Sequence, residues 1–226
     1  MASEIPHRIK KVLTITTLVL VFLGFAYQCI DHLWHKDEII ISNSLSLFNL
    51  NEENNIPAFY SALLLLSAAG LLGQIAYLER RSRYRLHWVG LSALFAYLSY
   101  DEAFVVHENL KQARIFLTAE HFLYDDAWIF IGFAFVAIVG LLYSRFILKL
   151  PQQIRTLFLV SGGIYVSGAL GMEVIGGYWQ FLHGKDFIHA LFATIEESLE
   201  MMGVVLFIYA LLQLIDLHPK SAKHDR

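Results

Sequence analysis

Six long apolar stretches dominate this chain of 226 residues and limit what it can fold into. A helix needs about 20 residues to cross a hydrocarbon core of about 30 Å. Six stretches approach or exceed that length, at residues 12–30, 58–78, 86–106, 127–148, 156–179 and 188–215. Hydrophobic residues make up 57% of the chain and charged residues only 16%, which is too apolar for an ordinary soluble domain. The sequence therefore predicts an all-α integral membrane protein, with six transmembrane helices forming a single domain over residues 1–226.

The basic residues predict the orientation of these helices, because basic loops resist transfer across a membrane. On one side of the expected bundle lie Arg8, Lys10, Lys11, Arg80, Arg81, Arg83, Arg85, Arg145, Lys149, Arg155, Lys220, Lys223 and Arg226. On the other side lie Lys36, Lys111, Arg114 and Lys185. The division covers all 17 basic residues and alternates from loop to loop, as six crossings require. We expect both termini in the cytoplasm and the protein in the bacterial inner membrane. Membrane topology explains the basic residues on this side, so they do not indicate a nucleic-acid partner.

Acidic residues occur within the apolar stretches, where an isolated ionised group costs several kcal/mol or more. At about 1.5 Å per residue, the acids of the third, fifth and sixth stretches fall in the outer half of the membrane. Helical spacing places five residues of the sixth stretch on one face: His189, Ala193, Glu196, Glu200 and Gly203. A comparable face of the fifth stretch carries Gly162, Ala169, Glu173 and Gly176. The many small residues of the fifth stretch also predict that its helix packs at the centre of the bundle.

These acids, with the histidines beside them, are expected to surround one polar centre. The candidate metal ligands are Asp101, Glu102, His107, Glu108, Glu173, His189, Glu196, Glu197 and Glu200. No Lys or Arg lies in the outer half of any apolar stretch, so protons, bound cations or water must balance the charge. Oxygen ligands with one or two imidazoles suit iron, manganese, zinc or calcium. The sequence thus predicts one or more divalent metal ions, without selecting among these elements.

Spacing within the sixth helix supports this interpretation. Asp186 and His189 are three residues apart, as are Glu197 and Glu200, and such pairs can hold one ion. The grouping is similar to di-iron and di-manganese carboxylate bundles, in which Glu-x-x-His motifs converge from facing helices. The stretches that carry these acids contain no Glu-x-x-His, so the similarity ends at the type of ligand.

Several polar groups have plainer explanations. Asp125 and Asp126 precede the fourth stretch, where helix capping and the helix dipole account for them without a metal. His107 and Glu108 lie at the outer interface, where exposed side chains explain them as well as ligation does. The longest loop, residues 31–57, mixes apolar and polar residues and is compatible with an amphipathic segment lying along the outer surface.

Three segments carry a resemblance to known proteins: "YLSYDEAFVVHENL", "GALGMEVIGG" and "TIEESLEMMG". They resemble a group of bacterial polytopic membrane proteins with an LSxDE…HE motif followed by an EExLEM motif. The resemblance covers much of the chain from Leu98 onward. It implies that Asp101, Glu102, His107, Glu108, Glu173, Glu197 and Glu200 act as one set, and it implies no particular activity.

Three functions remain open from the sequence. The first is a metal-binding membrane protein, with the further option of a metalloenzyme that activates water or oxygen on a lipid-phase substrate. The second is a transporter or channel for protons or cations. The third is an accessory subunit that binds membrane-protein partners, or a homo-oligomer, with its acids protonated and hydrogen-bonded. The sequence has no Walker-type loop, HExxH or cysteine pair, and it leaves enzymatic activity undecided. We favour the first function.

Overall fold

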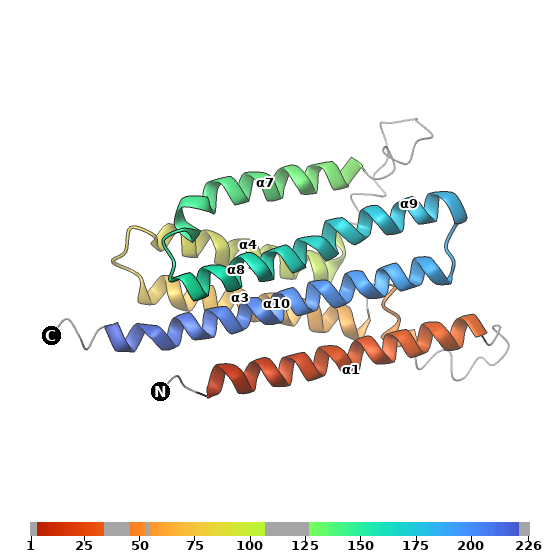
Figure 1. The fold of residues 1–226 in the computed structure, drawn as a ribbon, viewed down its shortest axis with the longest axis horizontal. Coiled ribbons are helices and arrows are strands. Elements are labelled where there is room, and N and C mark those ends of the chain that lie inside the picture. Colours follow the sequence, from red (N-terminus) through yellow and green to blue (C-terminus); the bar gives the residue numbers. More distant parts are fainter. Residues whose placement is uncertain (1–3, 34–45, 53–54, 107–126, 222–226) are drawn as a thin grey trace.

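The computed structural model describes residues 4–33, 46–52, 55–106 and 127–221, and all statements below concern these residues. They form six long helices that lie side by side along one axis (Figure 1). The helices are α1 (Ile5–Leu33), α3 (Ile56–Leu78), α4 (Arg85–Phe104), α7 (Ala127–Ile147), a continuous fifth helix and α10 (Phe187–Ser221). The fifth helix consists of α8 (Gln152–Val166), the π-helical turn η2 (Ser167–Met172) and α9 (Glu173–His183). Each predicted apolar stretch coincides with one helix, so the all-α prediction is confirmed.

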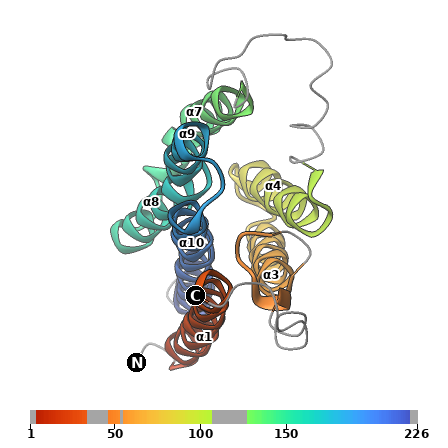
Figure 2. The ribbon, with the colours of Figure 1, turned by 90° about the vertical axis from the view of Figure 1, so that its right-hand side faces the viewer.

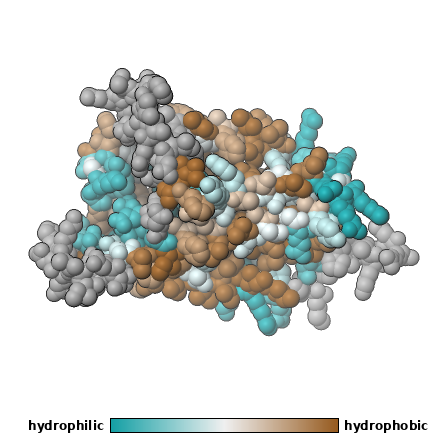
Figure 3. Space-filling view, turned by 180° about the vertical axis from the view of Figure 1, so that it is seen from behind, coloured by the Kyte–Doolittle hydropathy of each residue, from teal (hydrophilic) through white to brown (hydrophobic). Residues whose placement is uncertain are grey.

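The surface of the bundle suits a lipid environment. Five helical segments are long and apolar enough to cross a membrane: Ile5–His32, Ile56–Leu78, Ile129–Ile147, Gln152–His183 and Phe187–Leu217. Large apolar side chains point outward from them, including Phe22 at 67% exposed and Leu141 at 76% exposed. Figure 3 shows that apolar side chains cover much of the middle of the molecule, between more hydrophilic ends. The remaining long helix, α4, carries Asp101 and Glu102 in its last turn.

The centre of the bundle is α10, not the fifth helix that the small residues had predicted. α10 packs against α1, α3 and the whole length of the fifth helix, as the end-on view in Figure 2 shows. Its side chains are accordingly buried, with Met201 and Leu211 fully inaccessible. The prediction failed because glycines permit close approach on one face only, whereas a central helix must be packed on several faces.

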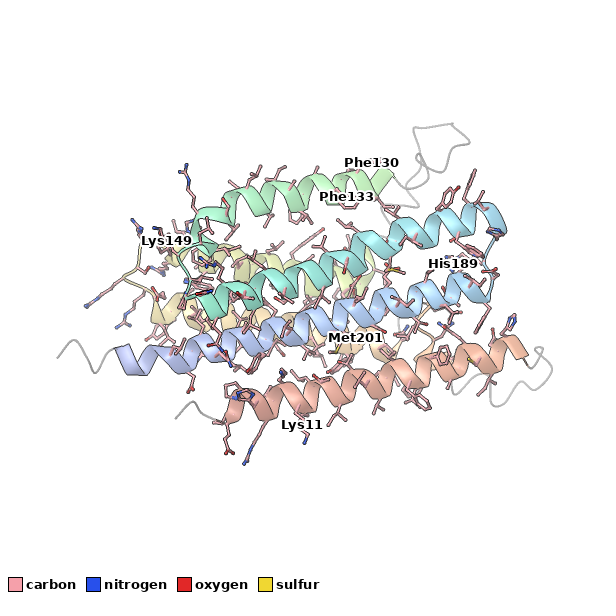
Figure 4. The ribbon with its side chains drawn as sticks, viewed as in Figure 1. Lys11, Phe130, Phe133, Lys149, His189 and Met201 are labelled. Atoms are coloured by element: carbon pink, nitrogen blue, oxygen red, sulfur yellow. The ribbon has the colours of Figure 1, made fainter. Side chains whose placement is uncertain are left out.

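Both ends of the chain lie at the same end of the bundle. In Figure 1, α1 begins and α10 ends on the left-hand side. Lys11 and Lys149 lie toward this end, whereas His189 lies at the opposite one (Figure 4). We call these the basic end and the acidic end. The start of α1 and the end of α10 at one end of the bundle agree with an even number of crossings. Which side of the membrane each end faces stays a prediction.

A cluster of aromatic rings joins four helices near the basic end. This aromatic cluster consists of Trp88, Phe95, Phe146, Phe158 and Phe207. Ring centroids lie 4.7 Å apart for Trp88 and Phe146, and 4.7 Å apart for Phe95 and Phe207. Because these residues come from α4, α7, α8 and α10, the cluster holds the two halves of the bundle together on this side.

Part of the long loop is packed rather than laid along the surface. The 3₁₀ turn η1 (Ser46–Phe48) is followed by Leu50, which is 4% exposed. Leu50 packs so closely on Gly24 of α1 that a Cβ there would lie 2.6 Å from the leucine side chain. Asn55 then caps α3 by accepting a hydrogen bond from the backbone N–H of Ala58 at 2.7 Å. The amphipathic segment was expected somewhere within residues 31–57, and residues 34–45 and 53–54 of that loop lie outside the described residues.

Candidate functional site

A cavity of about 1150 Å³ lies between α4, α7, the fifth helix and α10. We call it the carboxylate cavity, because seven acidic residues line it: Glu52, Asp101, Glu102, Glu173, Glu196, Glu197 and Glu200. Lys185 is the one Lys or Arg among its described lining residues. The rest of the lining is mainly apolar or glycine. The cavity therefore combines a strongly acidic part with a hydrophobic part.

Most of the predicted site residues meet in this cavity. Seven of them line it: Asp101, Glu102, Glu173, His189, Glu196, Glu197 and Glu200. The predicted faces are also confirmed, since the cavity is lined by all five residues of the α10 face and all four of the fifth helix. His107 and Glu108 lie outside the described residues. Whether the assembled groups hold a metal stays a prediction.

Glu200 lies at the heart of the acidic part. It is 9% exposed and next to Met201, which lies near the middle of α10 (Figure 4). Other carboxylates come within electrostatic range of it, led by Glu197 on its own helix, then Glu102 of α4. Glu196 and Glu173 follow. Acids from three helices are therefore close enough to influence one another, although no local sequence pattern joins them.

Tyr165 belongs to the same centre, and sequence reasoning missed it. Glu200, Glu102, Glu197 and Asp101 all interact electrostatically with this tyrosine, which lines the cavity from α8. A signal was present, because Tyr165 precedes Ala169 and Glu173 by four and eight residues and so shares their helical face. Its phenol can donate a hydrogen bond to a ligand or carboxylate, so Tyr165 can take part in recognition.

Two glycines set the spacing between α10 and the fifth helix at the level of the acids. A Cβ on Gly168 would lie 2.9 Å from the carbonyl oxygen of Glu196 and 3.0 Å from Cγ of Glu200. A Cβ on Gly203 would lie 2.8 Å from the backbone nitrogen of Tyr165. Gly168 falls within the π-helical turn η2, a type of helix defect that is frequent at functional sites. The acids are thus carried on helices in direct backbone contact.

The described side chains do not form a ready-made metal centre. No group of three or more His, Cys, Asp or Glu side chains is close enough to hold an ion within the part of the chain that the structure describes. Asp186 acts instead as a helix cap, since its Oδ1 accepts hydrogen bonds from the backbone N–H of His189 and the indole of Trp179, both at 2.9 Å. Nδ1 of His189 is buried and has no hydrogen-bond partner among the described residues. It is therefore available to a ligand.

The cap at Asp186 predicts a pH dependence of stability. The backbone N–H of His189 is the main cause that lowers the pKa of Asp186, with Trp179 adding to the effect. A carboxylate with a lowered pKa stabilises the folded state fully above its unfolded pKa, near 4, and loses that contribution as the pH falls through the folded value. We expect Asp186→Asn to unfold at a lower temperature than the parent at pH 7, with the gap closing toward pH 3.

This pH dependence is measured by thermal unfolding in detergent across that range. Asp31→Asn is the matched control, because Asp31 is an exposed acid near the same end of the bundle. A gap between the Asp186→Asn variant and the parent that stays constant down to pH 3 would show that the charge on Asp186 does not stabilise the cap.

Comparison with known proteins gives one match. A family model described as a domain of unknown function (DUF8692) matches residues 12–214. The matched region includes every lining residue of the carboxylate cavity. Neither the comparison with curated proteins nor that with solved structures finds a match.

Proposed function

Because the chain belongs to the DUF8692 family, whose function is unknown, we propose a function from the cavity itself: a membrane protein that binds divalent metal ions. The acids of the carboxylate cavity would supply most of the ligands. The excess of carboxylates is the observation that carries the proposal, since seven acidic residues and one lysine line a single cavity among the residues that the structure describes. Ionised carboxylates in a membrane interior are costly unless something compensates them, and a divalent ion compensates several at once.

The ion would bind among Glu200, Glu197 and Glu173, which line the cavity from α10 and the fifth helix. Glu197 and Glu173 each interact electrostatically with Glu200. Glutamate side chains are long and flexible, so carboxylates on neighbouring helices can close around a bound ion. His189 offers a buried imidazole nitrogen on the same cavity. Oxygen ligands with at most a few imidazoles favour manganese, iron, zinc or calcium.

The membrane setting adds two parts to the proposal. α4 forms the sixth crossing beside the five apolar helices, and the basic end faces the cytoplasm, which follows from the distribution of basic residues. The acidic end then opens toward the outer side. A bound metal there would polarise water or a substrate group at membrane depth, which suits an enzyme acting on a lipid-phase substrate.

Elemental analysis of the purified protein tests metal binding. We expect stoichiometric divalent metal in the parent, purified in detergent without chelator, and loss of most of it in Glu200→Ala and in Glu173→Ala. Glu79→Ala is the matched control, because Glu79 lies in the turn between α3 and α4, outside the cavity lining. Its metal content should equal that of the parent. Equal metal in the parent and in Glu200→Ala would refute the proposal.

Transport is the less favoured function. All seven lining acids lie at or toward the acidic end, and the described lining toward the basic end consists of apolar side chains such as Phe158, Phe207 and Ile147. A cation that crossed the membrane would meet no described charged ligand of the cavity lining in that half. The asymmetry favours a binding site that opens to one side over a complete path.

A further inference from the structure

The apolar part of the carboxylate cavity suggests what else it holds. It extends away from the acids between α4, α7 and α8, along Leu94, Leu98, Val136, Val139 and Gly163 to Phe207. Along the fifth helix, the distance from residue 173 at the acids to residue 158 at the aromatic cluster is roughly 20 Å. One leaflet of a bilayer is about half of a 30 Å core. The apolar part is therefore long enough for a lipid chain that reaches through one leaflet.

The cavity also opens toward the hydrophobic surface. Phe135 lines the cavity and is itself 46% exposed, so the cavity reaches the apolar belt of the molecule at α7. α7 contacts α4 nearer the basic end, where the hydroxyl of Tyr143 rests against Gly90 and Phe146 packs on Trp88. Farther toward the acidic end, the cavity lies between the two helices, lined by Leu94 and Leu98 of α4 and by Val136 and Val139 of α7. This position beside a lipid-exposed helix suits a ligand that comes from the bilayer.

The charge of the lining selects the head group. The described lining residues include seven carboxylates and one lysine, which give a formal charge of −6 when all are ionised, and one divalent ion would reduce the excess only to −4. A negatively charged head would be repelled by such a wall, whereas a positively charged one is attracted. Tyr165 adds a hydroxyl and an aromatic face on the same wall, and aromatic faces attract cations.

We propose that the carboxylate cavity binds a single-chain amphiphile with a protonated amine head. Its head lies beside Tyr165 with Asp101 and Glu102, which line the cavity and are not among the acids assigned to the metal. Its chain runs along α4 and α7 to the aromatic cluster. The molecule enters from the bilayer between these two helices. The inference goes beyond metal binding and does not depend on it, because the negative excess persists with or without one bound ion.

A photoreactive dodecylamine, with the reactive group at the end of its chain, tests this inference. The protein is reconstituted in phosphatidylcholine nanodiscs, irradiated with the probe and mapped by mass spectrometry. We expect cross-links concentrated at Phe158 and Phe207, where the chain would end. A dodecyl sulfate and a dodecanol with the same reactive group should each label these positions at least about tenfold less, which corresponds to about 1.4 kcal/mol in binding.

Tryptophan substitutions that fill the apolar part of the carboxylate cavity test the position of the chain, and a tryptophan outside the cavity is the control. Val139→Trp, which places an indole in the cavity, should lower the labelling by about tenfold. Ile138→Trp should leave it unchanged, because Ile138 is 56% exposed on the same helix and does not line the cavity. Leu94→Trp blocks the same space from α4, so the test stands even if one variant fails to fold. Each variant is first checked for a single symmetric peak in size-exclusion chromatography.

Several outcomes would overturn the inference. Equal labelling by the amine and the sulfate or alcohol would exclude a charge-selected head, and unchanged labelling in folded Val139→Trp would exclude the chain position. Labelling at the aromatic cluster that is no stronger than at lipid-facing Phe22 would also exclude the proposed position of the chain. The metal content of Val139→Trp, measured in parallel, should equal that of the parent. Loss of amine labelling and loss of metal are thus separate readouts, and either proposal can fail alone.

Discussion

Replacing Phe146 with alanine is expected to lower the free energy of unfolding by about 3–5 kcal/mol, the usual cost of truncating a fully packed aromatic side chain. Phe146 is 2% exposed and lies at the centre of the aromatic contacts of α7. Its ring meets Trp88 edge-on at 4.7 Å and stacks on His87 at 5.1 Å. Truncation would leave a void that these side chains cannot refill without moving α4 and α7 together.

The loss should be large because α7 has few other buried attachments. Ile129 is 4% exposed near its start, and Gly132 packs against Leu170 of η2, whereas most of the α7 side chains between Gly132 and Phe146 face outward. Thermal unfolding in detergent, followed by circular dichroism, measures the effect. Leu141→Ala is the matched control: Leu141 is 76% exposed on the same helix, so its truncation should change stability by about 0.5 kcal/mol at most. Similar unfolding midpoints for the two variants would contradict the assigned role of the cluster.

Adding one methyl group at Gly203 is expected to destabilise the protein by about 2 kcal/mol, although alanine is the better helix former. The new Cβ would lie 2.8 Å from the backbone nitrogen of Tyr165 and 3.0 Å from the carbonyl oxygen of Ser161. Both atoms belong to the backbone of α8, so the clash is relieved only if the helices separate. Separation would also move the fifth helix away from Glu200, so the proposed metal binding predicts a lower metal content in Gly203→Ala.

Gly163→Ala is the control, because we expect its effect on stability to be opposite to that of Gly203→Ala. No atom of the described residues lies within 4 Å of a Cβ built on Gly163, so the substitution should be neutral or stabilise the helix by up to about 1 kcal/mol. The two variants change the same residue type in neighbouring helices and differ only in what the methyl group meets. Unfolding midpoints that shift in the same direction would show that helix propensity outweighs the close approach, against our prediction.

The positions of the helices along the chain follow from the sequence, because the hydrocarbon core of a membrane restricts what the backbone can form. A backbone in the hydrocarbon core must satisfy its own hydrogen bonds, so a long apolar stretch can be little other than a helix. The faces of α10 and of the fifth helix that line the cavity were predicted for the same kind of reason. Residues three, four and seven apart share one side of a helix, which placed Glu196 with Glu200 and Glu173 with Gly176 before any packing was considered.

Packing decided the rest. Trp88 and Phe146 are far apart in the sequence, and nothing near either one predicts that their rings meet. The same holds for Tyr165 among the acids and for the central place of α10. Local rules also missed a role of Asp186: its spacing to His189 suggested a metal pair, and the structure shows that it caps a helix.

The sequence by itself determined that this chain forms long apolar helices that carry acids on defined faces. The helices follow because a backbone in lipid must form its own hydrogen bonds, and the faces follow from helical periodicity. Only the tertiary structure decided which faces meet, how close Gly168 and Gly203 bring them, and that the acids share a cavity with an apolar extension. Those features depend on contacts between side chains of different helices, and the fit of such surfaces is not encoded in any single stretch.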